Sequence, residues 1–289
     1  MTSRELADRI VGQFSGESER ADIWRGFEYV LETDAFLNLG YSGRFETHLV
    51  GSPQGRLVAQ VVDRLAELRG DPRGDRLVDV GCGRGIPTAY ATNTHGFDGV
   101  GVDLVAHNVA LARENVAGGE RRPSFVVGDA TALPIRDDAM AAAVAIDSIV
   151  YVPDKVGAYS ELARVLESGG DAVVSDLVVH DRATVDPEVL SRFGDAWDMP
   201  VPIPFSAYAE GIERTPLSIT AVDDLTDNGV GGFRKWTTAF LTLADGPTGP
   251  ILRRLLVEAR LDASVVIAQI RAAHDALPAL RHVLVTLER

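Results

Sequence analysis

The stretch that most constrains how this chain folds is a run of alternating glycines directly after a short apolar segment. It reads VDVGCGRG over residues 78–85 and is followed by a stretch expected to be helical over 86–94. A strand that ends in closely spaced glycines and opens a helix lets the backbone approach a ligand and points amide N–H groups at it. The run therefore predicts an α/β fold with a ligand at the carboxyl end of its first strand.

The middle of the chain alternates between expected strands and expected helices. Apolar residues at helical spacing predict a helix over 55–69, and further helices are expected over 86–94, 105–117 and 154–167. Gly169 and Gly170 are expected to cap the last of these. Strands are expected at 77–80, 99–102, 125–127, 141–146 and 172–177. This alternation is typical of a parallel sheet covered by helices on both faces.

The pattern changes after about residue 180. Residues 183–204 contain four prolines and cannot form one helix, so we expect a covering segment there. The elements expected after it are a helix near 205–214, a strand at 217–224, helices over 229–278 and a last strand at 283–287. We predict a single domain over 1–289, divided into an arm (1–55), a core (56–182), a lid (183–204) and a C-terminal part (205–289) with a helical insertion at 229–280.

Composition narrows the class of protein. Of the 289 residues, 46% are hydrophobic and 24% charged, as in an ordinary globular protein, and no apolar run approaches the about 18 residues of a membrane span. The formal charge of −14 argues against nucleic acid and membrane partners, because both are anionic. A single cysteine and no secretory signal predict a cytoplasmic protein. Six histidines without paired spacing predict no metal site.

An acid after the second expected strand bears on the kind of ligand. Asp103 lies 18 residues past Gly85, where a carboxylate would receive the hydroxyls of a ribose. The fingerprint of nicotinamide dinucleotide sites requires a third glycine at position 86, but Ile86 stands there and Pro87 follows. The spacing therefore argues against dinucleotide binding.

With the glycine run, several further stretches resemble the class I S-adenosylmethionine-dependent methyltransferases of the small-molecule branch. They are VDL at 102–104, GDA at 128–130 with Leu133 and Pro134 after it, DSIVYVPD at 147–154, and LGY at 39–41. The resemblance covers roughly residues 35–225. It implies a Rossmann-like, seven-stranded, mostly parallel sheet with helices on both faces, an antiparallel last strand, an N-terminal helical arm and helical lid insertions.

The resemblance implies S-adenosylmethionine as the cofactor and S-adenosylhomocysteine as its product. The residues that it assigns to cofactor binding are Tyr41, Asp79, Gly81, Cys82, Gly83, Gly85, Asp103, Leu104, Asp129, Ala130 and Asp147. Each has a plainer interpretation as well. Asp79 is either near the methionine amino group or a structural acid, Asp129 either binds adenine or caps a turn, and Cys82 is better explained as a small packing residue than as a nucleophile.

Residues for the chemistry are expected beyond the carboxyl ends of the fourth and fifth strands. His180, Asp147 and Tyr151 are the catalytic candidates, and His180 is the preferred general base because the ordinary pKa of histidine lies near neutrality. Many relatives carry two histidines at positions 150 and 151, where this chain has Val150 and Tyr151. The substrate-pocket candidates are Ser148, Tyr151, Trp197, Tyr208 and Trp236, although the tryptophans and Tyr208 could simply pack the lid.

The leading hypothesis is an enzyme that transfers a methyl group from S-adenosylmethionine to an O, N or C atom of a small, partly apolar metabolite. The transfer would be an in-line displacement in an enclosed pocket. The first alternative is a cofactor-binding relative that catalyses a non-methylating reaction, such as a cyclisation in natural-product biosynthesis. The second is a non-catalytic binding module. The sequence predicts neither the acceptor nor the oligomeric state.

Overall fold

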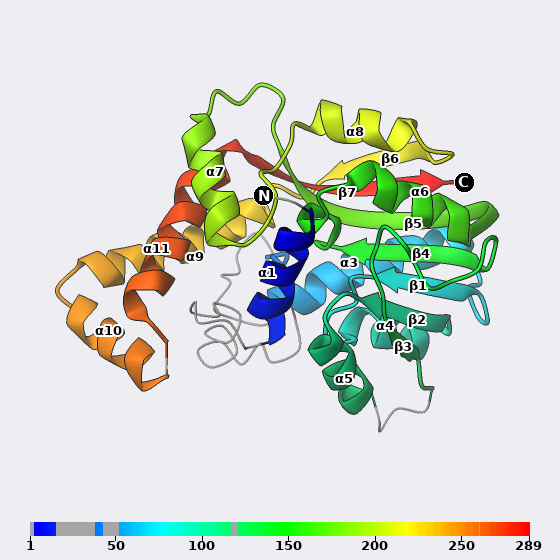
Figure 1. Ribbon diagram of the computed structural model, residues 1–289, viewed down its shortest axis with the longest axis horizontal. Coiled ribbons are helices and arrows are strands. Elements are labelled where there is room, and N and C mark those ends of the chain that lie inside the picture. The colour runs from blue at the N-terminus through cyan, green and yellow to red at the C-terminus, as the bar shows by residue number, and fades with distance from the viewer. Residues whose placement is uncertain (1–2, 16–37, 43–51, 117–120, 260) are drawn as a thin grey trace.

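A seven-stranded sheet forms the centre of the protein in the computed structural model, which describes residues 3–15, 38–42, 52–116, 121–259 and 261–289 (Figure 1). The strand order is β3-β2-β1-β4-β5-β7-β6, and β7 alone runs antiparallel to its neighbours within the described chain. The strands are β1 (Arg76–Val80), β2 (Asp98–Asp103), β3 (Ser124–Val127), β4 (Met140–Ile146), β5 (Leu166–Val179), β6 (Ser218–Asp224) and β7 (Leu280–Glu288).

The helices fall into two groups, those on the faces of the sheet and those at its end. The helices and helical turns within the sheet part are α3 (Pro53–Arg69), α4 (Ile86–Tyr90), η1 (Ala91–His95), α5 (Ala106–Asn115), η2 (Ile149–Tyr151), α6 (Lys155–Val165) and α8 (Phe205–Glu213). Those gathered beyond the carboxyl ends of the parallel strands are α1 (Ser3–Ser15), α7 (Pro187–Ala196), α9 (Val230–Asp245), α10 (Gly249–Glu258), α11 (Ala263–Ala276) and η3 (Leu277–Ala279) (Figure 1).

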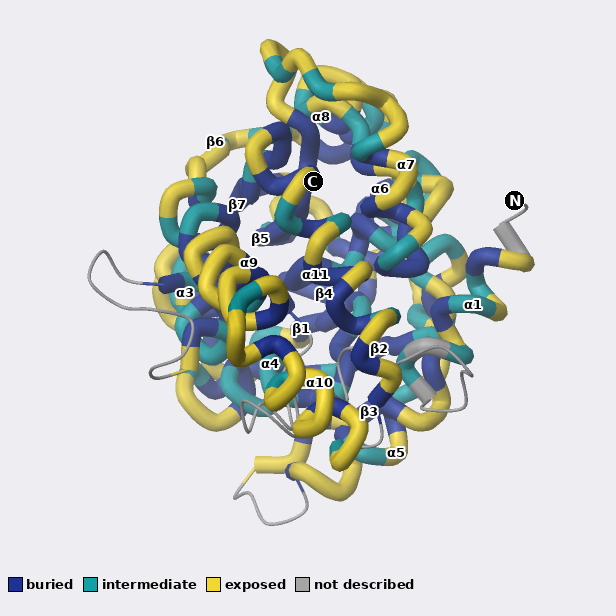
Figure 2. The backbone as a smooth tube through the Cα atoms, turned by 90° about the vertical axis from the view of Figure 1, so that its left-hand side faces the viewer, coloured by how far each residue is buried: buried dark blue, intermediate teal, exposed yellow. Residues whose placement is uncertain are grey.

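Both faces of the sheet are buried by helices. The apolar stripe of α3, including Leu57, Val61 and Leu65, packs on β1, β4 and β5, whereas α6 and α8 cover the opposite face. The β4 sequence MAAAVAI is buried throughout, as expected of a central parallel strand covered on both sides. Figure 2 shows the strands dark blue inside a shell of partly exposed helices. A third apolar cluster joins α7, α9 and α11 to the end of β5.

The structure confirms the predicted fold class, including the antiparallel last strand and the helical N-terminal arm. The helix expected over 86–94 is present, and its last five residues, Ala91–His95, form a π-helical turn. One local expectation is wrong. Gly169 and Gly170 do not cap α6, because that helix ends at Val165 and β5 begins at once. They lie instead where the pairing of β5 with β4 shifts register.

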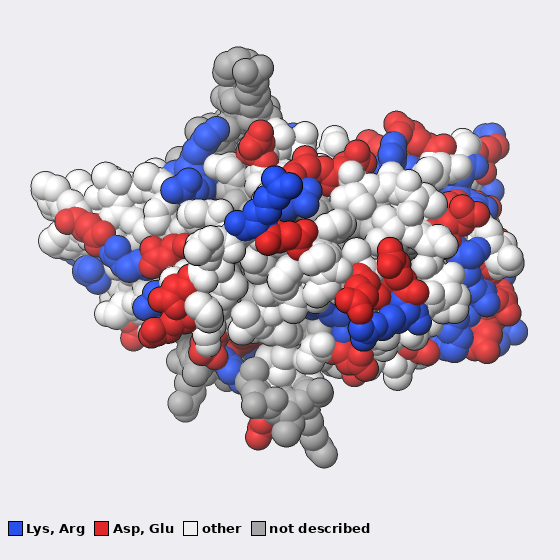
Figure 3. All heavy atoms as spheres, turned by 90° about the horizontal axis from the view of Figure 1, so that it is seen from above, with Lys and Arg blue, Asp and Glu red and all other residues white. Residues whose placement is uncertain are grey.

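The covering segment at 183–204 contains one helix, α7, whose first residue is Pro187, where the missing N–H costs nothing. The boundaries proposed above for the arm, core, lid and C-terminal part stay predictions. Acidic and basic side chains are interspersed on the face that Figure 3 shows. Over the described residues, every helix is too short or too polar to span a bilayer.

Candidate cofactor and acceptor site

The glycine turn after β1 is the floor of the site. Gly81, Gly83 and Gly85 have φ angles of 75°, 52° and 85°, in the left-handed region that glycine adopts without strain. A Cβ added at Gly81 would lie 2.4 Å from the Cβ of Ser148, so the turn and the segment after β4 touch without a side chain between them. The N–H groups of Gly81 and Cys82 donate to the Val102 carbonyl at 2.8 and 3.0 Å.

Asp103, the last residue of β2, is tied to the same turn. Its Oδ2 accepts the Gly83 N–H at 2.8 Å, and its Oδ1 accepts the Val105 N–H at 2.9 Å and the Asn108 amide at 3.2 Å. Burial raises the pKa of Asp103, while these hydrogen bonds act in the opposite direction. The carboxylate is therefore held in one orientation at the edge of the turn.

Asp79 lies beneath the turn rather than in the site. Its side chain is fully buried, and its Oδ2 accepts the hydroxyl of Thr88 at 2.6 Å, whereas its Oδ1 has no hydrogen-bond partner. Burial raises the pKa of Asp79 to about 7, and the nearby charge of Asp103 adds to this effect. An unpartnered carboxylate oxygen in this position favours a neutral carboxyl group.

A cavity of about 300 Å³ opens above the turn, and residues from the glycine run, VDL, GDA and DSIVYVPD line it. The predicted site residues that line it are Gly81, Gly83, Asp103, Leu104, Asp129, Ala130, Asp147, Ser148 and Tyr151. Four predicted cofactor residues do not. Tyr41 packs against the α3 face of the core, and Asp79, Cys82 and Gly85 lie behind the turn. Burial raises the pKa of the Cys82 thiol well above its ordinary value, as suits a packing residue.

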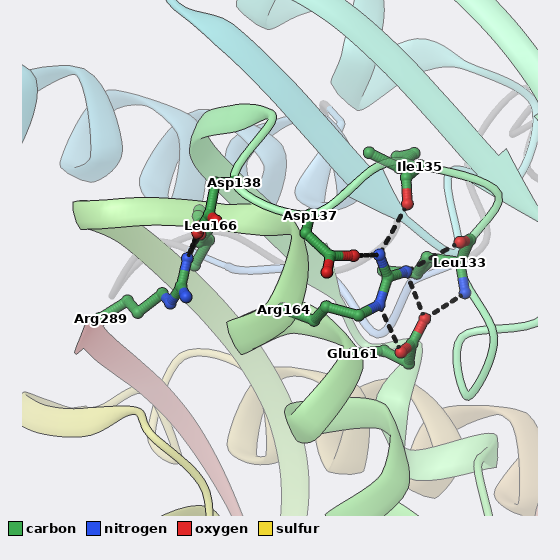
Figure 4. A network of polar contacts seen from close by, with 8 residues as sticks. All are labelled: Leu133, Ile135, Asp137, Asp138, Glu161, Arg164, Leu166 and Arg289. Atoms are coloured by element: carbon green, nitrogen blue, oxygen red, sulfur yellow. Dashed lines mark hydrogen bonds and ion pairs between the residues drawn. The ribbon is translucent and has the colours of Figure 1, made fainter.

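The loop after β3 is held in place by one arginine of α6. Arg164 donates to the carbonyls of Leu133 and Ile135 and to the carboxylates of Glu161 and Asp137, and Glu161 accepts the Leu133 N–H (Figure 4). Asp129 heads this loop, and its Oδ1 accepts both the N–H and the hydroxyl of Thr131 at 2.8 Å. The adenine-side wall of the predicted site is therefore a supported loop, which the motif GDA alone did not reveal.

Helix α1 closes the cavity from the outside. Ala7, Ile10 and Phe14 line it, and the ring of Phe14 meets Tyr151 edge to face with centroids 5.6 Å apart. No sequence motif pointed to these residues. The only signal was the spacing of Leu6, Ile10 and Phe14, which places three apolar side chains on one face of a helix.

A second, smaller cavity of about 40 Å³ adjoins the first at Asp147 and Tyr151. Apolar and aromatic side chains form most of its wall. The described residues that line it are Asn38, Leu39, Asp147, Val150, Tyr151, Leu177, Phe193, Trp197, Met199, Phe233 and Leu277. Burial raises the pKa of the Tyr151 phenol, aided by the charges of Asp147, Asp198 and Asp176, so this hydroxyl stays protonated.

Asp147 lies where the two cavities meet, and three donors surround its carboxylate. Oδ2 accepts the Leu39 N–H at 2.9 Å, and Oδ1 accepts the Ser175 hydroxyl at 2.8 Å and faces His282 Nε2 at 2.8 Å. Burial opposes ionisation, but His282 and these hydrogen bonds outweigh it and lower the pKa of Asp147. The sequence analysis did not find His282, because no motif links β7 to the segment after β4.

Three other predicted residues lie away from the cavities. His180 is exposed, its Nδ1 accepts the Arg182 N–H, and it lines neither cavity. Tyr208 is buried on the α6 face of the sheet, where its hydroxyl meets that of Tyr159, so the structure does not place it at the acceptor pocket. Trp236 stacks between Phe233 and Phe240 and lines neither cavity. Of the three aromatic candidates after residue 190, Trp197 alone lines the second cavity.

Comparisons with known proteins agree with this geometry. Residues 78–174 match the family described as a methyltransferase domain. The chain is 31% identical over 175 residues to the O-methyltransferase rstn1 of Aspergillus nomiae, covering 60% of this chain and 75% of that protein. It is 35% identical over 133 residues to the methyltransferase GfsG of Streptomyces halstedii, covering 45% of this chain and 46% of that protein.

Two solved structures share the fold at low sequence identity. A geranyl diphosphate C-methyltransferase from Streptomyces coelicolor, solved with Mg²⁺, geranyl diphosphate and S-adenosylhomocysteine, superposes with a TM-score of 0.71 at 17% identity, covering 98% of this chain and 97% of that one. The [4+2]-cyclase SpnF superposes with a TM-score of 0.69 at 20% identity, covering 91% of each chain.

The chain therefore belongs to the class I S-adenosylmethionine-dependent methyltransferases. It is an enzyme of the branch that methylates metabolites and natural products, and S-adenosylmethionine is its cofactor. Within the described residues no group of three or more histidine, cysteine, aspartate or glutamate side chains is arranged to hold a metal ion.

Proposed function

We propose that the protein methylates a hydroxyl oxygen of a small, uncharged and largely apolar metabolite. The observation that carries this proposal is the second cavity, which meets the first at the carboxylate of Asp147 and the hydroxyl of Tyr151. None of the described residues lining it carries a positive charge, so a phosphate or carboxylate on the acceptor would find no partner there. Several curated relatives are named O-methyltransferases, which favours oxygen over nitrogen or carbon.

The first cavity fits the cofactor by the chemistry of its lining. Asp103 offers an oriented carboxylate for two ribose hydroxyls, Asp129 and Ala130 form the adenine side, and the glycine turn leaves room for the backbone to approach. When bound, S-adenosylmethionine supplies an electrophilic methyl group whose carbon bonds to the acceptor oxygen, while the electron pair of the broken C–S bond stays on sulfur and the hydroxyl proton leaves to a base.

The residues of this chain then have three tasks. Apolar side chains of α7, α9 and the β5 end hold the acceptor and exclude water. Tyr151 lies at the junction, where its neutral hydroxyl can donate a hydrogen bond. Asp147 is our proposed proton acceptor in place of His180, because it lines both cavities and is held ionised. A role for His180 stays an untested prediction.

Isotopic labelling tests the proposal directly. The protein is incubated with S-adenosylmethionine carrying a ¹³C-methyl group and with an extract of small metabolites, and the labelled product is analysed by NMR. We expect one new methoxy signal, since carbon shifts separate O-, N- and C-methyl groups. A labelled methyl on nitrogen or carbon would correct the acceptor atom, and label on a phosphorylated metabolite would contradict the uncharged pocket.

The alternative is a non-methylating reaction at the same site, such as a cyclisation. The [4+2]-cyclase SpnF shares this fold, and the apolar lining of the second cavity would also suit an apolar cyclisation substrate once α7 moves. Both functions predict cofactor binding, so binding alone does not separate them. A substrate converted with no change in mass, and with no S-adenosylhomocysteine formed, would establish the alternative.

A further inference from the structure

A buried histidine from the end of the chain reaches the junction of the two cavities. His282 lies on β7 opposite Leu177 of β5, has no exposed surface, and places its Nε2 2.8 Å from Asp147 Oδ1. The two residues are 135 positions apart in the sequence. The Ser175 hydroxyl donates to the same oxygen, so two donors from neighbouring strands hold one side of the carboxylate.

The surroundings of the imidazole decide which nitrogen carries the proton toward Asp147. An ionised carboxylate only accepts hydrogen bonds, so Nε2 must be the donor. Nδ1 has no hydrogen-bond partner and lies against Gly229, the residue that caps the N-terminus of α9, where a Cβ would come within 2.2 Å of it.

We propose that His282 is a positioning residue for Asp147: its Nε2–H fixes the buried carboxylate and keeps it ionised, so that Asp147 can take the acceptor's proton. This inference rests on the proposed function for the proton transfer, but the link between the two side chains stands on geometry alone. A carboxylate this deeply buried becomes protonated when no strong hydrogen-bond donor faces it. A protonated Asp147 cannot take the proton of the acceptor hydroxyl.

The other groups that face this pair make the histidine more necessary. Asp176 on β5 and Tyr151 on η2 interact electrostatically with Asp147, and Asp198 adds negative charge near Tyr151. Lys155 interacts with Asp176 and donates to three carbonyls of the 149–152 turn. On the β6 side, the guanidinium of Arg281 is engaged by Asp224. Lys155 and Arg281 are thus engaged elsewhere, and His282 supports the charge of Asp147 against the cost of burial.

The first test observes Asp147 directly and needs no turnover. The protein is labelled with ¹³C-carboxyl aspartate, and the Asp147 signal is identified by its loss in Asp147→Asn. In the wild type we expect Asp147 to stay ionised to a lower pH than an ordinary aspartate. In His282→Leu it should take up a proton at a pH at least one unit higher, and in His282→Gln, which keeps an N–H donor, at an intermediate pH. An identical titration in wild type and His282→Leu would overturn the proposal.

The second test follows the acid limb of kcat/KM, using the acceptor found by ¹³C labelling. The limb should move to higher pH in His282→Leu and less in His282→Gln, while the affinity for S-adenosylhomocysteine stays within about threefold. His95→Leu is the matched control, because it breaks a surface His95–Asp63 contact of 2.7 Å outside both cavities. If kcat/KM falls by the same factor at every pH and the acid limb does not shift, His282 contributes to packing alone.

The two tests also separate this inference from the proposed function. If Asp147 titrates as expected but no hydroxyl is methylated, the proposed function is wrong, whereas the inference that His282 keeps Asp147 ionised is confirmed. If His282→Leu does not fold, the His282→Gln titration still decides, because loss of the aromatic donor alone must raise the pH at which Asp147 protonates.

Discussion

The first cavity, which we propose holds the cofactor (the cofactor cavity), and the second, which we propose holds the acceptor (the acceptor cavity), touch, yet they are built in opposite ways. Apart from α1, the described wall of the cofactor cavity comes from residues 80–154, most of them at a strand end or in the turn that follows it. The wall of the acceptor cavity combines residues 38, 39, 147, 150, 151, 177, 193, 197, 199, 233 and 277. The first is made by local chain geometry, while the second exists only once distant helices have packed together.

The Asp147→Asn variant tests the acceptor side and should have the largest effect. It keeps the shape of the side chain but removes the charge that takes the proton, so we expect turnover to fall by about 10²–10⁴. Calorimetry should show affinity for S-adenosylhomocysteine within a few-fold of the wild type.

The same measurement on His180→Ala decides between the two candidate bases. His180 is exposed and lines neither cavity, so turnover should stay near that of the wild type. A loss of about 10² or more in His180→Ala, together with near-normal Asp147→Asn, would restore the interpretation drawn from the sequence.

This contrast shows which site residues could be predicted from the sequence. Strand ends are fixed by local patterns, so the positions of Gly81, Asp103, Asp129 and Asp147 followed from their motifs. His180 was chosen because it follows β5, but β5 extends to Val179, and at its end the chain turns toward solvent. His282 could not be predicted, because its place depends on the antiparallel register of β7 against β5.

Substitution of Asp103 should give the second largest effect, on the cofactor side. Asp103→Ala removes two expected charge-assisted hydrogen bonds to the ribose, each contributing about 1.5–3 kcal/mol. It also releases the Gly83 N–H that Asp103 holds at 2.8 Å. The Kd of S-adenosylhomocysteine, measured by calorimetry, should rise by at least about tenfold, whereas Asp71→Ala, which breaks an exposed pair with Arg73 outside both cavities, should leave it unchanged. An unchanged Kd in Asp103→Ala would exclude Asp103 as the ribose ligand.

The glycine turn offers a matched pair of substitutions. Gly81 and Gly169 have nearly equal φ angles, 75° and 76°, but a Cβ at Gly81 would collide with Ser148, whereas a Cβ at Gly169 meets nothing within 4 Å. Gly169→Ala should therefore cost about 1–2 kcal/mol of stability from the backbone alone. Gly81→Ala should cost more in urea unfolding and also weaken cofactor binding. Equal losses in both variants would mean that the contact with Ser148 is easily relaxed.

Stability should fall with rising pH where Asp79 titrates. The pKa of Asp79 is raised to about 7 in the folded protein, against about 3.9 in an unfolded chain. The folded state therefore binds more protons between these values, and each pH unit in this window lowers the free energy of unfolding by up to about 1.4 kcal/mol. The free energy of unfolding, measured with urea at several pH values from 4 to 7, should decrease less with rising pH in Asp79→Asn than in the wild type. An equal change with pH in the two proteins would contradict the argument that burial raises the pKa of Asp79.

The smallest expected effect concerns the link between the two regions. Arg9 of α1, which covers the cofactor cavity, forms an ion pair with Asp198, which follows α7 on the acceptor side. The acceptor cavity, at about 40 Å³, is too small for a metabolite until α7 and its flanking residues move.

The ion pair between Arg9 and Asp198 is partly exposed, and such a pair contributes less than about 1 kcal/mol. Arg9→Ala should therefore speed hydrogen exchange in α1 and α7 by at most about fivefold, while Arg254→Ala, which breaks a surface pair on α10, should leave both unchanged. Faster hydrogen exchange in α1 but not in α7 would show that these two helices move independently.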